Sequence, residues 1–222
     1  MMASFFISNR LLPSFGRPLT AIGLIVAAMA VQAQAPAPWP TKPISLVVTY
    51  PPGGGADAMA RLIAPKMGEA LGQNVIVENK PGAGGQIGAA AVAKAAPDGY
   101  TLMLDASSFA VNPSLYPKLP YDTEKAFRAI GVIALFPNVV LVNAQFPAKN
   151  VAELITAAKV KKDAVSFASS GNGSAQHLAG ALFESAAKVD MVHVPYKGGG
   201  PALNDVIGGQ VPVFFGNLAS TL

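Results

Sequence analysis

The chain repeatedly places a glycine-rich joint between a β-prone apolar run and a segment with helical spacing. The first joint is Pro51–Gly55, and the helix after it is expected to end at Gly72, with Pro65 kinking it or delaying its start. The alternation predicts βαβ units and a mainly parallel sheet. Strands are predicted over residues 44–50, 75–77 and 101–104, and helices over residues 59–71 and 87–95.

The same order recurs in the second half of the chain. Gly171 follows Gly53 by 118 positions, and Lys197 follows Lys80 by 117. The glycine joints and the lysine recur at nearly the same offset, which favours two halves of the same design over a chance match. Strands are predicted over residues 130–135, 139–142, 165–168, 191–194 and 211–215, and helices over residues 151–159, 174–188 and 201–207. The simplest architecture is two α/β lobes, split near residues 104–110, whose glycine joints face a shared cleft.

The amino-terminal segment has the layout of a secretory signal peptide. Arg10 and Arg17 precede the apolar run Leu19–Val31 and a small-residue site, so cleavage is expected after Ala33. The run is short for a bilayer span, which needs about 20 residues, although an uncleaved anchor is the alternative. We therefore predict a signal peptide over residues 1–33, lobe one over 34–105, lobe two over 106–216 and a crossover starting at 217–222.

Charge and composition exclude several classes of function. The formal net charge of +4 falls to +2 once the signal peptide is removed, because it carries two arginines and no acid. That charge is too small and dispersed for a nucleic-acid surface. The chain has no cysteine and two histidines, so it has no disulfide or thiolate site, and a histidine-based metal site is not expected. An exported chain without cysteine suits a bacterial periplasm.

The glycine joints suit an anion, because a strand-to-helix joint offers unpaired N–H groups and the positive end of a helix dipole. They match neither the phosphate-loop nor the dinucleotide fingerprint, and G-x-S-x-G is absent. Simple tight turns are the alternative. Asp57 is expected to cap the first helix or order its loop, with Ser107 and Ser108 at the strand end. The negative charge of Asp105 would weaken the binding of an anion next to it. We therefore expect either that Asp105 points toward the hinge or that the ligand also carries a cationic or hydroxyl group.

A hydrolase is the rival interpretation of the second joint. Ser170 and Ser174 precede His177, which is the arrangement of a nucleophile and a base. No acid is obviously placed to orient the histidine, so the alternative stays open but unsupported.

Five ordered motifs resemble the Bug family, the extracytoplasmic solute receptors of tripartite tricarboxylate transporters. They are VVTYPPGGGADAMARLIA, VIVENKPGAGGQIGAAAVAKAAPDGYTLML, NPSLYPKLPYD, ASSGNGSAQHLAGALF and VHVPYKGGGPALNDVIGGQV. The resemblance implies a two-lobed periplasmic binding protein of the type II, Venus-flytrap kind. It also implies a non-enzymatic receptor without cofactors, expected to be a monomer. Such a receptor passes a small carboxylate (a di- or tricarboxylate, an acidic amino acid or an aromatic acid) to membrane permease subunits.

The family's ligand loops map onto specific positions of this sequence. The expected ligand-binding residues are Tyr50, Gly53, Gly54, Asp57, Gly84, Gly85, Ser107, Ser108, Ser170, Asn172, Gly173, Ser174, His177 and Asn217. Two departures stand out. Pro212 and Gly216 occupy positions where relatives often carry aspartate, and the chain stops where relatives cross back to complete lobe one. We therefore expect an incomplete first lobe with uncovered sheet edges, and a non-functional fragment is a third interpretation.

Overall fold

The structure is a computed structural model that describes residues 38–218 and 221. The chain divides into residues 1–39 and residues 40–222, and the fold described below belongs to the second unit. The predicted signal peptide lies outside the described residues. Within the described part, every helix is too short or too polar to cross a membrane.

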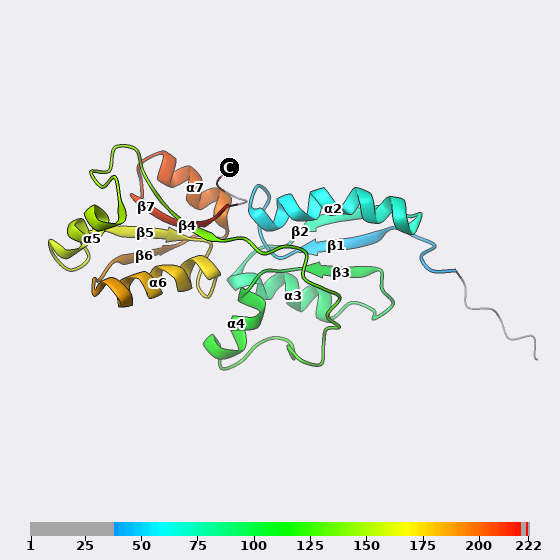
Figure 1. The fold of residues 1–222 in the computed structure, drawn as a ribbon. Coiled ribbons are helices and arrows are strands. Elements are labelled where there is room, and N and C mark those ends of the chain that lie inside the picture. The colour runs from blue at the N-terminus through cyan, green and yellow to red at the C-terminus, as the bar shows by residue number, and fades with distance from the viewer. Residues whose placement is uncertain (1–37, 219–220, 222) are drawn as a thin grey trace, which may run out of the picture. The chain divides into compact units, whose positions relative to one another are not determined.

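The first sheet is parallel, with strand order β2-β1-β3 (Figure 1). Its interior is apolar, with Leu46, Val48 and Leu104 buried against Ala60 of the first helix. β3 is an edge strand that pairs only with β1 among the described strands, in keeping with the expected uncovered edge. The elements are β1 (Ile44–Val48), α2 (Gly55–Leu71), β2 (Val75–Asn79), the short η1 turn (Ala83–Gly85), α3 (Gln86–Ala93) and β3 (Thr101–Leu104).

The second sheet has strand order β4-β7-β5-β6, with β4 antiparallel to β7 and the other pairs parallel. Side chains alternate across it: Phe167 and Phe215 pack with α5 and α6, while Ala168 and Phe214 pack with α7 on the opposite face. Both faces are therefore covered, as a mostly parallel sheet requires. The elements are β4 (Asn138–Val142), α5 (Val151–Lys159), β5 (Ser166–Ser169), α6 (Ala175–Ala187), β6 (Val192–Pro195), α7 (Gly199–Ile207) and β7 (Val213–Asn217).

Helix α2 begins at Gly55, earlier than predicted, so the expectation of a late start was wrong. Pro65 lies inside the helix on its exposed face. Proline has no N–H to donate to the carbonyl of Arg61, and both residues are exposed. Gly72 ends the helix as predicted, with φ of 68° in the left-handed region.

The segment between the sheets differs most from the prediction. Helix α4 (Ser108–Leu115), which has Pro113 inside it, was not predicted. The strand predicted over residues 130–135 is wrong: this segment is irregular, and Ile130 and Leu135 are 84% and 90% exposed. Its β-like sequence finds no partner strand among the described residues, and a strand needs one to satisfy its backbone.

Candidate functional site

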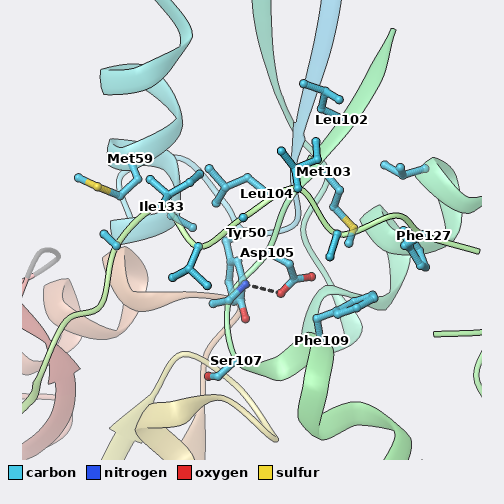
Figure 2. Close-up of a pocket in the computed structure, with 18 of the residues that line it drawn as sticks. Tyr50, Met59, Leu102, Met103, Leu104, Asp105, Ser107, Phe109, Phe127 and Ile133 are labelled. Carbon is cyan, nitrogen blue, oxygen red and sulfur yellow. Dashed lines mark hydrogen bonds between the residues drawn. The ribbon is translucent and has the colours of Figure 1, made fainter. Parts of the chain in front are cut away.

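A cavity of about 1450 Å³ collects the ends of strands and the starts of helices from both sheets. The carboxyl ends of β1 and β3 contribute Tyr50, Asp105 and Ser107, which Figure 2 shows beside the apolar residues of β3. This is the edge at which open α/β sheets bind ligands. The second sheet contributes Ser170, Ala175, Gln176, Gly199 and Asn217.

The amino ends of three helices reach this cavity. Gly55 starts α2, Ala175 starts α6 and Gly199 starts α7, and each is a lining residue. The first N–H groups of a helix have no partner within it and carry the positive end of the dipole. The cavity therefore presents backbone donors from three separate segments.

Asp57 orders the first glycine joint. Its buried carboxylate accepts a hydrogen bond from Gly53 N at 3.0 Å, from Asn79 Nδ2 at 2.9 Å and from Arg61 Nε at 3.0 Å. Burial alone would raise the pKa of Asp57, but the bonds from Arg61, Gly53 and Asn79 outweigh it and hold the pKa below its usual value. Asp57 thus binds its own loop, while Gly54 and Gly55 line the cavity.

Two glycines allow the joint after β1 to approach the second sheet. A Cβ at Gly55 would lie 2.9 Å from Oδ1 of Asn217, and one at Gly198 would lie 2.6 Å from the Pro51 ring. A side chain at Gly55 would require Asn217 to move, and one at Gly198 would clash with the Pro51 ring. Gly216 packs on Phe214 and does not line the cavity.

A buried polar chain links β1 to β3 beside the cavity. The Tyr50 hydroxyl bonds the Ser108 hydroxyl, which donates to Oδ1 of Asp105 at 3.1 Å. Asp105 Oδ1 also accepts from Ala106 N at 2.6 Å. Burial, and then the Asp105 charge, raises the pKa of Tyr50 well above its usual value. Tyr50 is therefore a neutral hydroxyl held in place by Ser108.

The second glycine joint is fixed by its own side chains. Ser174 caps α6: its hydroxyl accepts from His177 N at 3.2 Å and donates to Gly171 O at 2.7 Å. The Nδ1 atom of His177 accepts from Gly173 N at 3.2 Å. The His177 ring stacks on His193, with centroids 4.0 Å apart, and Nε2 of His193 lies 2.6 Å from the Ser169 hydroxyl. These contacts shape the loop that presents Ser170 to the cavity.

This arrangement does not pair a nucleophile with a base at the second joint. The Ser174 hydroxyl is bonded to the backbone, and the His177 ring bonds Gly173 N rather than a serine hydroxyl. The serine that does meet an imidazole, Ser169 at His193, is fully buried. The geometry gives the hydrolase alternative no support.

The predicted site residues fall into two groups. Tyr50, Gly54, Ser107, Ser170 and Asn217 line the cavity. The others are not lining residues, and most of them hold or adjoin the loops: Gly53, Asp57, Gly84, Gly85, Ser108, Asn172, Gly173, Ser174 and His177. Whether any of them touches a ligand stays a prediction.

Sequence reasoning missed Gly55, Gln176 and Gly199 as lining residues. Gln176 is buried, with its side chain at the cavity. The signal for Gly199 was present, because the Lys197–Gly200 loop was recognised as a second glycine joint without being assigned to the site. No local signal distinguishes Gln176 from any other polar residue in a first helical turn.

Known proteins resemble this chain in sequence and in fold. Residues 59–222 match the tripartite tricarboxylate transporter family receptor. Protein BugT of Bordetella pertussis is 38% identical over 209 residues, which are 93% of this chain and 64% of BugT. The R. palustris protein Rpa4515 with adipate superposes with a TM-score of 0.80 at 36% identity, over 82% of this chain and 62% of that one. MatC from Rhodopseudomonas palustris with bound malate gives 0.74 at 34% identity, with the same coverage.

The chain spans 61% of the length of a curated relative from Pseudomonas sp. strain P51 and 64% of BugT. The α/β fold predicted from sequence is confirmed by the periplasmic binding protein structures that it matches. The family match extends over residues 59–222, which is most of the chain. The chain belongs to the Bug family of tripartite tricarboxylate transporter receptors, which are solute-binding proteins.

Proposed function

We propose that this chain belongs to an extracytoplasmic receptor that captures a small carboxylate for a tripartite tricarboxylate transporter. It acts in the periplasm after removal of residues 1–33, as a monomer without cofactor or catalysis, and passes its ligand to the membrane permease subunits. The observation that carries the proposal is the convergence of three helix amino ends on one cavity.

The chemistry of the cavity favours an anion held by neutral donors. Ser107, Ser170, Gln176 and Asn217 supply hydroxyl and amide groups next to those helix ends. The cavity-lining residues, all within the described part, include a single cation, Arg128, on the irregular segment before residue 130. Backbone donors and helix dipoles stabilise a carboxylate without a counter-ion.

The relatives indicate the ligand class. One similar structure holds adipate and another holds malate, and both are small dicarboxylates. We therefore place a di- or tricarboxylate first among the candidates, with acidic amino acids and aromatic acids as further members of the same class. Donors from both sheets would surround such a ligand. Binding would then favour the conformation in which both sets of donors engage it.

The test is thermal unfolding and calorimetric titration of residues 34–222 with malate and adipate. Adipamide, the neutral diamide of adipate, is the matched control because it keeps the length and removes both charges. An acid present at about 100 times its Kd should stabilise the fold by about 2.7 kcal/mol. This corresponds to a rise in Tm of about 5–10 °C for a domain of this size.

The proposal fails if adipamide raises Tm as much as adipate does. The cavity would then recognise the length of the ligand and not its negative charges. It also fails if a cooperatively folded protein responds to no carboxylate in the panel. A chain that shows no cooperative transition would contradict the proposal for these residues and support the fragment interpretation.

A further inference from the structure

Asp105 is an acid in a cavity otherwise built to receive an anion. It lines the cavity next to Tyr50 and Ser107 (Figure 2). One carboxylate oxygen, Oδ1, accepts hydrogen bonds from Ala106 N and the Ser108 hydroxyl. Among the described residues, none of the ion pairs includes Asp105.

The second oxygen, Oδ2, is sealed from water and has no hydrogen-bond partner. It faces Gly85, where a Cβ would lie 2.8 Å from Oδ2 and 3.3 Å from the Thr49 hydroxyl oxygen. That hydroxyl is also buried without a partner. An unpartnered carboxylate oxygen therefore lies near an unpartnered hydroxyl in a space closed to water, where a negative charge on Oδ2 is poorly solvated.

The groups around Asp105 do little to stabilise its negative charge. Tyr50 and Tyr121 are the titratable side chains that its charge reaches, and in both the pKa is raised by burial first and by Asp105 second. Glu124 and Arg128 also line the cavity, but both are exposed. Burial raises the pKa of Asp105 more than Ala106 N, the Thr49 hydroxyl and the Ser108 hydroxyl together lower it.

From this geometry we propose that carboxylate binding is coupled to proton uptake by Asp105, so that the affinity of the site rises as pH falls. The proton comes from solvent and resides on Oδ2, the carboxylate oxygen that has no hydrogen-bond partner. A bound anion repels the ionised carboxylate and so favours the protonated form. By linkage, protonation must then favour anion binding to the same degree. The inference rests on the proposed function.

The first test counts protons by titration calorimetry of the full chain with malate at about pH 7, in phosphate and in Tris, whose ionisation enthalpies differ. Malate is fully ionised there, since small carboxyl groups titrate near pH ~4–5. We expect uptake of between a fraction of a proton and about one proton per malate. Zero uptake by a malate-binding protein would overturn the inference, while no binding of malate or adipate would overturn the proposed function itself.

The second test uses Asp105→Asn. The amide keeps an oxygen at the Oδ1 position and places an NH₂ donor toward Thr49, so the local bonds are preserved. This variant should bind malate about tenfold more tightly at about pH 7.5, equivalent to ~1.4 kcal/mol, with no proton uptake. Asp163→Asn is the matched control: it removes an exposed acid that does not line the cavity, and its effect should stay under about twofold.

Proton uptake that persists in Asp105→Asn would assign the coupling to another group, such as His177, and overturn the inference. An affinity for malate that falls in Asp105→Asn would show that the carboxylate contacts a donor on the ligand, which also contradicts it. If this variant does not fold, the proton count and pH profile of the unaltered chain decide the question alone.

Discussion

The stacked imidazoles beneath the second glycine joint should make the stability of the chain depend on pH. Burial, and then the neighbouring His177, lowers the pKa of His193 from 6.5 to about 4. Burial also lowers the pKa of His177, against the opposing effect of Glu184. His193 packs between the Phe167 and His177 rings and bonds the Ser169 hydroxyl, so the folded state favours its neutral form.

The sign and size of the effect follow from linkage. Between pH 6.5 and about pH 4 the unfolded chain protonates His193 and the folded chain does not, so the unfolded state binds more protons. The stabilisation is therefore complete above pH 6.5 and is lost as pH falls toward about 4. A shift of about 2.5 units corresponds to ~3.4 kcal/mol at most. Partial exposure of the ring reduces the expected value to about 1.5–2.5 kcal/mol.

The assay is urea unfolding at about pH 7.5 and about pH 4.5, comparing the unaltered chain with His193→Gln. Glutamine can still bond Ser169 but does not titrate. Between these two pH values the free energy of unfolding should fall by about 1.5–2.5 kcal/mol less in the variant than in the unaltered chain. The contributions of the carboxylates are the same in both and cancel in the comparison. His177→Gln should also reduce the pH dependence, because it removes both the lowered pKa of His177 and its effect on His193. Equal pH dependence in the unaltered chain and His193→Gln would refute the reasoning.

Two further predictions concern packing and the first joint. Gly180→Ala should lower the free energy of unfolding by about 1–2 kcal/mol despite its better helix propensity, because its Cβ would lie 2.3 Å from the Phe167 ring. Gly131→Ala, which meets nothing within 4 Å, should change it by less than about 0.5 kcal/mol; equal effects in urea unfolding would contradict the packing argument. Asp57→Ala should cost about 2 kcal/mol and weaken malate binding, because Gly53 N loses its acceptor. Unchanged malate affinity in calorimetry would show that Asp57 does not order the loop for the ligand.

Local patterns determined much of this protein. The bounds of β3 and α5 match the predicted ranges, and Gly72 ends α2 as expected. These features depend on periodicity, turn residues and caps, which act over a few neighbouring positions. The five motifs that identified the family are also stretches of neighbouring residues that can be read directly from the sequence.

The tertiary structure decided what the local pattern left open. Residues 130–136 have a β-like sequence but no strand to pair with, and α4 forms despite Pro113. Only the fold brings His177 to His193, and only the fold turns Oδ2 of Asp105 toward Gly85 and Thr49. Sequence spacing specifies which residues lie at a joint. Which of them face a cavity and which hold its walls depends on segments far apart in the chain, and those meet only when the sheets and helices pack.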